Sequence, residues 1–272
     1  MIEMKSPEQL QLMRRAGLVV SDTLKQLRAA VAPGVSTEEL DELARETITG
    51  AGATPSFLGY HGYPKTICTS VNEEIVHGIP SPAKRLAEGD VISIDCGAIL
   101  DGWHGDSAIT VAVGEVDPEL TELLRVCEES MWAVFAGARL GMRIRDLGAL
   151  VERTVLPSGF GIVDHYGGHG IGTAMHQDPH VLNHGRGSRG PKLVEGMALA
   201  IEPMITAGDP ETEELADGWT VITTDRSYAA HFEHTFTMTA NGPWVLTAAD
   251  GGAAKLAEYG VSIAPIENLA RP

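Results

Sequence analysis

The sequence predicts an α+β fold in which two pseudo-symmetric halves surround a central antiparallel sheet. Helix-patterned segments with capping signals precede strand-patterned segments in each half, and an Asp-Gly turn joins two of the strand patterns. Parts of the first half also recur in the second half at one constant offset. Because no low-complexity linker separates the halves, we expect a single domain over residues 1–272, with an internal duplication of about 34–95 and 141–202.

The repetition occupies two separate blocks of sequence. Gly34, Leu40 and Leu43 have identical counterparts 107 positions later, and the segment LAEGDVISID recurs as LVEGMALAIE at the same offset. The second block aligns Asp95 with Glu202, so a carboxylate ends the same strand pattern twice. Because chance identities would not share one offset, we infer that each half supplies an acid to a central site.

Each half begins with two helix signals. Residues 6–9, Ser-Pro-Glu-Gln, combine an N-cap, a proline at the first helical position and a capping-box partner, and Pro-Gly at 33–34 closes this helix. A second capping box, Ser36 to Glu39, starts the next helix. In the second half we predict a helix from Asp117 to about Phe135 and a shorter companion over about 145–155.

Strand patterns lie between the helices, and two of them form a hairpin. Asp101-Gly102 is a strong two-residue turn signal, which would place Asp95 opposite Ala108 and make Asp106 its diagonal neighbour on the same face. Such neighbours are about 7–8 Å apart at Cα, which leaves room for a metal ion between the side chains. The predicted strands are Val91–Gly97, Ser107–Val113, Ala198–Ile205, Trp219–Thr223 and Ala230–Thr239.

The composition restricts the classes of function. No apolar run approaches the roughly 20 residues that cross a bilayer, and the net charge of −17 argues against binding to nucleic-acid phosphates. Cys68, Cys96 and Cys127 are widely separated, which suits a reducing compartment without a disulfide framework. The opening MIEMKSPEQ lacks a signal-peptide pattern. We therefore expect a cytoplasmic protein that binds neither membranes nor nucleic acid.

Four carboxylates and one imidazole form a candidate metal site. An oxygen-rich set with one nitrogen suits hard or borderline divalent cations, and four carboxylates can bind two metals about 3.5–4 Å apart. A buried glutamate in an apolar strand is costly unless it is paired or binds a metal. The five residues are Asp95 and Asp106 in IDCGAILDGWHGD, His169 in HYGGHGIG, Glu202 in AIEPM and Glu233 in HFEHT.

Some of these residues have simpler interpretations. Asp106 could be a solvated acid at the end of a strand, and Glu233 could form a hydrogen bond with His231 or His234. The glycine-rich segment around His169 is a poor helix and predicts a loop or strand edge where the backbone approaches another group closely. Three nearby histidines are interpreted as supporting or structural residues: His165, His180 and His184.

The order and flanks of the five candidate ligands resemble the methionine aminopeptidases of the pita-bread (creatinase/aminopeptidase) fold. The resemblance extends from residue 6 to about residue 247. Only 31 positions separate Glu202 from Glu233, which leaves no room for the helical subdomain of the second class of these enzymes. The opening also lacks the zinc-binding extension of eukaryotic type I enzymes, so the bacterial type I enzymes are the most similar group.

The resemblance implies one catalytic metallopeptidase domain with a dinuclear metal centre. In the family pattern Asp95 chelates one ion, His169 and Glu202 bind the other, and Asp106 and Glu233 bridge both. Cobalt, manganese, iron(II) or zinc could fill such a site, since cellular supply rather than affinity often decides.

The resemblance also implies the reaction. A methionine aminopeptidase removes the N-terminal methionine of nascent proteins and peptides when the second residue is small. Glu202 would accept the proton of the attacking water, His176 would face the carbonyl oxygen, and His77 would lie beside the scissile bond and the amine. Either histidine could instead be an ordinary hydrogen-bonded residue. The expected partners are the N-termini of nascent chains, at the ribosome, and the family suggests a monomer.

The first side chain of the substrate needs an apolar pocket. Sulfur–aromatic contacts favour methionine there, though only modestly. Met175 occupies a position where relatives often have an aromatic residue, which leaves the shape of the pocket open. On aromatic content alone, the pocket residues would belong to the core. They are Phe57, Tyr60, Tyr63, Cys68, His77, Met175 and Trp219.

Two other functions remain as alternatives. Proline-specific dipeptidases share the five ligands but usually carry a further N-terminal domain, and here barely 60 residues precede the pocket motif. A metal-free binding protein on the same scaffold is the other alternative, but such relatives have lost ligands that this chain retains.

Overall fold

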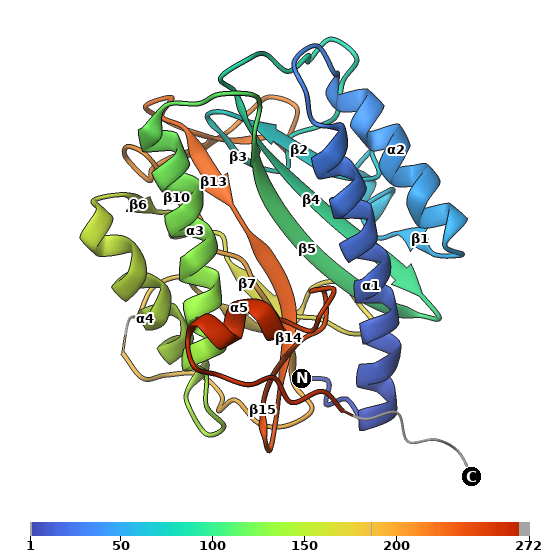
Figure 1. Cartoon of the computed structure of the whole chain (residues 1–272), viewed down its shortest axis with the longest axis vertical. Helices are drawn as coiled ribbons and strands as arrows, with labels where there is room; N and C mark the ends of the chain where they lie inside the picture. The colour runs from blue at the N-terminus through green and yellow to red at the C-terminus, as the bar shows by residue number, and fades with distance from the viewer. Residues whose placement is uncertain (1, 186, 267–272) are drawn as a thin grey trace.

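The computed structural model describes residues 2–185 and 187–266, so the ends of the predicted 1–272 domain lie partly outside the described residues. Its helices are α1 (Pro7–Ala30), α2 (Thr37–Gly50), α3 (Pro118–Gly137), α4 (Ile144–Val155) and α5 (Ala253–Glu258), with short 3-10 helices at Tyr60–Gly62 and Leu156–Ser158. Figure 1 shows α1 and α2 on the right of the view and α3 and α4 on the left, with long strands between them. The two helix pairs come from the two halves of the sequence.

The predicted helix starts are confirmed. The Ser6 hydroxyl accepts a hydrogen bond from the backbone N–H of Gln9 at 3.3 Å, and the Gln9 side chain accepts one from the backbone N–H of Ser6 at 2.8 Å. Ser36 and Glu39 form the same capping box at α2. Both helices predicted in the second half are present, and α3 continues past the predicted end at Phe135.

The strands form one large and two small antiparallel sheets. Their bounds are β1 Thr54–Pro55, β2 Cys68–Val71, β3 Glu74–Val76, β4 Val91–Leu100, β5 Trp103–Ala112, β6 Gly161–Ile162, β7 Gly168–Gly170, β8 Gln177–Val181, β9 Ala198–Ile201, β10 Met204–Thr206, β11 Thr212–Glu214, β12 Val221–Thr223, β13 Ala229–His231, β14 Glu233–Thr239 and β15 Gly242–Val245. The large sheet has the order β1-β4-β5-β14-β9-β7-β8, with β2 beside β4 and β15 beside β14. The small sheets are β13-β10-β6 and β11-β12-β3. The predicted α+β fold around an antiparallel sheet is confirmed.

The hairpin formed by β4 and β5 has the predicted register. Asp95 pairs with Ala108 and Gly97 pairs with Asp106, so the two acids are diagonal neighbours. The turn residues Asp101 and Gly102 have φ angles of 52° and 81°, as a two-residue turn with both central residues in the left-handed region requires. Both strands are longer than predicted and continue to the turn itself.

Three strand predictions are wrong in their extent. The segment Ala198–Ile205 is divided at Glu202-Pro203 into β9 and β10, because a proline has no N–H to continue a ladder. The segment Ala230–Thr239 is divided at Phe232 into β13 and β14. In both cases the chain leaves one sheet for another: β9 pairs with β14 in the large sheet, whereas β10 pairs with β13 in a small one. Trp219 lies in a turn before β12, where Asp217 accepts a hydrogen bond from its backbone N–H at 2.9 Å.

The offset of 107 residues recurs in the backbone geometry. The N–H of Gly34 donates to the carbonyl of Leu86 at 2.7 Å, and the N–H of Gly141 donates to the carbonyl of Leu193 at 2.8 Å. Gly34 and Gly141 have φ angles of 90° and 88°, a region that glycine adopts without strain. The sequence repetition thus has a counterpart in equivalent hydrogen bonds.

Each helix pair packs on strands of the large sheet. Leu27 of α1 and Leu40 of α2 are buried in one cluster with Ile94 of β4. In a second cluster, Phe135 of α3 packs against Phe236 of β14 with ring centroids 4.8 Å apart. This burial on both sides fixes the strands that carry the candidate site. Within the described ranges, no helix has the length and apolar character needed to cross a membrane.

Candidate active site

One cavity of about 120 Å³ collects the candidate site residues. All thirteen lining residues were predicted from the sequence as metal ligands, catalytic residues or pocket residues. They are Phe57, Tyr60, Tyr63, Cys68, His77, Asp95, Asp106, His169, Met175, His176, Glu202, Trp219 and Glu233. An adjoining cavity of about 570 Å³ is lined by His77, His169, His176 and Glu202 together with His165, Tyr166, Gly167, Gln177, Asp178, His180 and Met204.

The large sheet brings three of the acids together. Ala108 on β5 pairs with Asp95 on β4 at one side and with Glu233, the first residue of β14, at the other. Asp106 lies two residues before Ala108 on the same face. Glu202 follows directly after β9, at the point where that segment changes sheet. The interruptions of the two predicted strands therefore occur at or next to candidate ligands.

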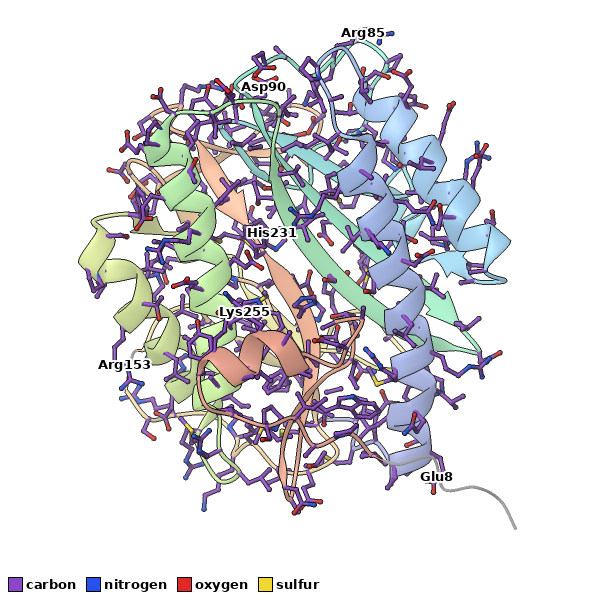
Figure 2. The ribbon with its side chains drawn as sticks, in the orientation of Figure 1. Glu8, Arg85, Asp90, Arg153, His231 and Lys255 are labelled. Atoms are coloured by element: carbon purple, nitrogen blue, oxygen red, sulfur yellow. The ribbon has the colours of Figure 1, made fainter. Side chains whose placement is uncertain are left out.

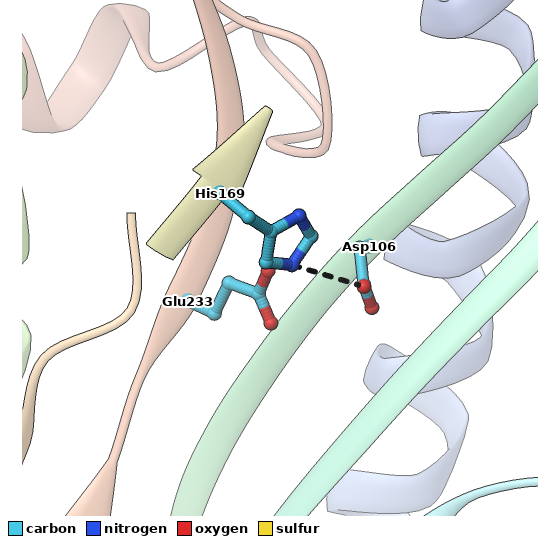
Figure 3. Close-up of side chains that lie close together, drawn as sticks. All are labelled: Asp106, His169 and Glu233. Carbon is cyan, nitrogen blue, oxygen red and sulfur yellow. Dashed lines mark ion pairs between the residues drawn. The ribbon is translucent and has the colours of Figure 1, made fainter. Parts of the chain in front are cut away.

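His169 lies on β7 and faces the acids. Its Nε2 is 4.0 Å from Asp106 Oδ2 and 3.5 Å from Glu202 Oε1, and its side chain groups with Asp106 and Glu233 as Figure 3 shows. Its Nδ1 is 2.9 Å from the carbonyl oxygen of Gly170. A carbonyl only accepts hydrogen bonds, so Nδ1 carries the hydrogen and Nε2 presents its lone pair to the acids.

Glycines allow the strand that carries His169 to lie this close to its neighbours. A Cβ atom at Gly168 would lie 2.1 Å from the carbonyl oxygen of Ala200, and one at Gly170 would lie 2.1 Å from that of Asp178. The predicted close approach of the backbone is confirmed, but the prediction of a loop or strand edge is wrong, because β7 lies between β9 and β8 in the large sheet.

The acids are buried without sufficient hydrogen-bond partners. Asp106 is 3% exposed and Glu233 is 2% exposed. One side-chain oxygen in each of Asp95, Asp106 and Glu233 has no hydrogen-bond partner among the residues that the structure describes. An unpartnered buried carboxylate oxygen is costly, which indicates that this cluster is shaped for cations.

The pKa values of the acids reflect burial and mutual repulsion. Burial raises the pKa of Asp95 to about 7 and that of Glu202 to about 8. Burial, and then the neighbouring Asp95, raises the pKa of Asp106 well above its ordinary value, and burial and then Asp106 do the same for Glu233. Burial, with a contribution from His176, lowers the pKa of His169 to about 3, so its imidazole is neutral. A neutral imidazole among carboxylates is a donor set suited to divalent metals.

The two candidate catalytic histidines border the acids from another side. The Nδ1 of His176 is hydrogen-bonded to the Tyr60 hydroxyl at 2.8 Å, and its ring centroid is 4.4 Å from that of His169. His77 has a φ angle of 61°, a left-handed conformation that is strained for histidine, and its ring lies edge-on to Trp219 at 6.4 Å. Burial lowers the pKa of His77 to about 4, so it is uncharged at neutral pH.

The candidate substrate pocket is a small apolar cluster beside the acids. Phe57, Tyr63, Cys68 and Met175 are buried in it, with Tyr60, Ile79 and Trp219 partly buried around them. The Tyr63 hydroxyl donates to the carbonyls of Ile67 and Gly78, both at 3.0 Å, which fixes this ring. Ile79 was not predicted from the sequence, because a single isoleucine in a loop carries no distinguishing pattern.

An N-terminal contact supports one wall of the site. The Glu3 carboxylate accepts hydrogen bonds from the Thr173 N–H at 3.1 Å, the Thr173 hydroxyl at 2.8 Å and the Gln177 amide at 2.6 Å. Lys5, whose side chain is 2% exposed, donates to the Gln177 side-chain oxygen at 3.2 Å. We call these four residues the N-terminal clasp. Because the clasp holds Thr173 within the loop that carries His176 and Gln177 directly after that loop, it anchors this part of the cavity wall.

His231 is a further residue that sequence reasoning considered only as a possible hydrogen-bond partner of Glu233. It is 1% exposed and lies near the centre of Figure 2, whereas the labelled Glu8, Arg85 and Arg153 lie at the periphery. Its Nε2 is 3.5 Å from Glu202 Oε2 and has no hydrogen-bond partner. Among the histidines interpreted as supporting or structural, His165 and His180 line the adjoining cavity, and His184 contacts Glu152 at 3.2 Å.

Comparisons with known proteins agree on one family. The model of metallopeptidase family M24 matches residues 11–240. The methionine aminopeptidase of Clostridium acetobutylicum is 48% identical over 247 residues, which cover 91% of this chain and 99% of that relative. Methionine aminopeptidase 1 of Mycobacterium tuberculosis is 50% identical over 252 residues, covering 90% of this chain and 95% of that relative. The crystal structure of methionine aminopeptidase from Thermotoga maritima has a TM-score of 0.90 at 40% identity, and covers 91% of this chain and 100% of that chain.

These similarities extend over almost the whole of this chain and of its relatives, so they establish both fold and family. The predicted pita-bread fold and the predicted class of enzyme, a metal-dependent aminopeptidase, are confirmed. The chain belongs to metallopeptidase family M24 and, within it, to the methionine aminopeptidases.

Proposed function

We propose that this enzyme removes the N-terminal methionine from nascent proteins and peptides whose second residue is small, by hydrolysis assisted by two divalent metal ions. The observation that carries the proposal is the juxtaposition of four buried acids and a neutral imidazole with an apolar pocket in one cavity. The acids can bind metal cations, and the pocket beside them can receive an apolar side chain of the substrate.

Five residues are proposed to hold the metal ions. Asp95 holds one ion, His169 and Glu202 hold the other, and Asp106 and Glu233 serve both. The unpartnered oxygens of Asp95, Asp106 and Glu233 fit this assignment, since metal ions would complete their coordination. When bound, such ions activate a water molecule and polarise the scissile carbonyl. Cobalt, manganese, iron(II) and zinc are all compatible with this donor set.

Three residues are proposed to act on the reacting atoms. Glu202 accepts the proton of the attacking water and passes it to the leaving amine, a role that suits a carboxylate at the wall of the cavity between His169 and His231. His176, held by Tyr60, donates a hydrogen bond to the developing oxyanion. His77 lies beside the scissile bond and the substrate amine, where its neutral ring can accept or donate a hydrogen bond.

The specificity for the substrate's first two residues is proposed from the enclosed shape of the cavity and from the similarity to known enzymes. The apolar cluster of Phe57, Tyr60, Tyr63, Cys68, Met175 and Trp219 receives the methionine side chain. A cavity of about 120 Å³ has little spare volume around the first side chain, and the preference for a small second residue is proposed from the similarity to methionine aminopeptidases. The accepted second residues would be Gly, Ala, Ser, Thr, Cys, Pro and Val.

The cellular setting is proposed from the same reasoning. We infer a monomeric, cytoplasmic, single-domain enzyme that meets nascent chains at the ribosome. The surface charge of the chain, −17 in total, favours a peptide substrate over direct contact with nucleic acid or anionic lipid.

Release of methionine from short peptides tests the proposal. Protein stripped of metal and then supplied separately with Co²⁺, Mn²⁺, Fe²⁺ or Zn²⁺ should release methionine from Met-Ala-Ser, and a chelator should stop the reaction. Met-Ile-Ser and N-acetylated Met-Ala-Ser serve as controls for the second residue and for the free amine, and both should resist. Failure to release methionine with any of the four ions would favour a binding protein without activity. Equal cleavage of Met-Ile-Ser would indicate a broader aminopeptidase.

A further inference from the structure

We propose that His231 is a positioning residue for Glu202, to which its Nε2–H donates a hydrogen bond. The inference deepens the proposed function and rests on it, because Glu202 is there the proton acceptor. His231 Nε2 lies 3.5 Å from Glu202 Oε2, and its partner atoms in Glu202 and Glu233 lie within 4.8 Å of one another and of the imidazole.

The burial of His231 requires a partner for its Nε2. The residue is 1% exposed, and this nitrogen has no hydrogen bond to another protein atom within the described part of the chain. A buried polar atom left unpaired costs about 1–3 kcal/mol. The Glu202 carboxylate accepts hydrogen bonds and lies close to this nitrogen. A shift of a few tenths of an ångström brings its Oε2 within ordinary hydrogen-bond length.

The backbone of both residues is held in place. Thr110 on β5 accepts a hydrogen bond from the N–H of His231 at 2.9 Å and donates one to its carbonyl at 2.8 Å. The side chain of Asn183 donates to the carbonyl of Glu202 at 3.0 Å. With the two backbones fixed, the contact between the side chains sets the orientation of the carboxylate.

The two oxygens of Glu202 face two different imidazoles. Oε1 lies 3.5 Å from Nε2 of His169, which carries a lone pair because its Nδ1 donates to Gly170. Oε2 lies 3.5 Å from Nε2 of His231, which can carry a hydrogen in both the neutral and the charged ring. His231 therefore holds Oε2 and leaves Oε1 directed toward His169 and the cavity, where a proton has to be accepted.

Two substitutions separate positioning from metal binding and from packing. His231→Leu removes the donor and keeps an apolar side chain of similar bulk, whereas His231→Gln keeps an N–H donor of similar reach. His184→Gln is the matched control, because His184 forms a histidine–glutamate contact of 3.2 Å with Glu152 outside the cavity. For each variant, kcat and KM are measured with Met-Ala-Ser, and Co²⁺ affinity and stoichiometry are measured by calorimetry.

His231→Leu should lower kcat by about 10- to 100-fold, the effect of losing one hydrogen bond to a charged group, with KM changed less than about twofold. His231→Gln should restore most of kcat and keep Co²⁺ affinity within about threefold, whereas His231→Leu should also weaken Co²⁺ binding, because Glu202 is itself a proposed ligand. His184→Gln should behave as the unmodified enzyme.

Three results would overturn the inference. Equal kcat in His231→Leu and the unmodified enzyme would show that Glu202 needs no such partner, while the proposed function would stand. A collapse of Co²⁺ affinity or a lost binding site in both variants would make His231 a ligand instead. An unmodified enzyme that binds Co²⁺ but releases no methionine would overturn the proposed function and this inference together.

Discussion

The side chains of the candidate metal ligands contact one another in the site and contribute little to the hydrophobic core. His169 contacts the acids through Nε2 and is held by Gly170 through Nδ1, and Glu202 lies between two histidines. We expect His169→Ala and Glu202→Gln each to lower kcat by at least about 100-fold, because each removes a metal ligand or the proton acceptor. The far-ultraviolet circular dichroism should be unchanged. Activity near that of the unmodified enzyme in either variant would contradict the ligand assignment.

His176 is expected to act in the transition state. Replacement by alanine removes a donor to the oxyanion, a loss of about 3 kcal/mol or about 100-fold in kcat, with a smaller rise in KM. Tyr60→Phe removes only the 2.8 Å hydrogen bond that holds the ring, and should lower kcat less than His176→Ala does. Steady-state kinetics on Met-Ala-Ser measure both effects. If His176→Ala raised KM alone, the residue would bind substrate rather than stabilise the oxyanion.

Sequence reasoning could propose the acids and the pocket because each stands in a short, distinctive motif. Glu233 lies in HFEHT and Asp95 in VISID, where an ionisable residue interrupts an apolar strand pattern. Glu3 carried no such signal, and His231, although it belongs to HFEHT, was considered only as a possible hydrogen-bond partner of Glu233. The Glu3 carboxylate accepts a hydrogen bond from Thr173, which lies 170 positions away in the sequence. Only the completed fold brings these two residues together.

The loop between β7 and β8 is the element whose position the N-terminal clasp controls. Glu3→Ala should remove three hydrogen bonds, two to Thr173 within this loop and one to Gln177 directly after it, and let His176 move. We expect kcat/KM for Met-Ala-Ser to fall about tenfold, which corresponds to about 1.4 kcal/mol. The exposed Glu46→Ala provides the matched control and should be neutral. Unchanged kinetics in Glu3→Ala, with the chain folded, would show that the loop holds its position without the clasp.

At the scale of elements, sequence patterns identified helices better than strand ends. The helix starts follow from local capping chemistry, as at Ser6 and Ser36, so they could be predicted. The divisions at Glu202-Pro203 and Phe232 depend on which sheet each segment joins, and apolar patterns do not encode that choice. The β4–β5 register could be predicted because the Asp-Gly turn is local.

The molecule as a whole should respond to pH through its buried acids. In the metal-free protein, burial raises the pKa of Asp95 to about 7 and that of Glu202 to about 8. Between the ordinary pKa values of these acids, about 4, and the raised values, the folded state therefore holds protons that the unfolded chain has released, and the free energy of unfolding falls as pH rises. Below about pH 6.5 the buried histidines make the free energy of unfolding rise with pH, because burial lowers the pKa of His77 to about 4 and that of His169 to about 3. In this range the unfolded chain holds protons that the folded state has released.

Calorimetry of metal-free protein between about pH 6.5 and 8.5 measures this response. Tm should fall by about 2–4 °C for each 1 kcal/mol lost. Glu202→Gln, which cannot titrate, should show a shallower slope, and metal-loaded enzyme should show none. A rise of Tm with pH in the metal-free protein would mean that the acids are stabilised as anions by other groups.

The raised pKa values of the buried acids also govern how the enzyme acquires its ions. Near neutral pH, a proton on Glu202, whose pKa burial raises to about 8, already balances part of the negative charge of the cluster. An incoming dication therefore exchanges with hydrogen ions instead of entering an open anionic site. Uptake of the ions releases protons, and the ions are held more tightly as pH rises. The interior carboxylates thus couple the processing of new proteins to both metal supply and proton activity.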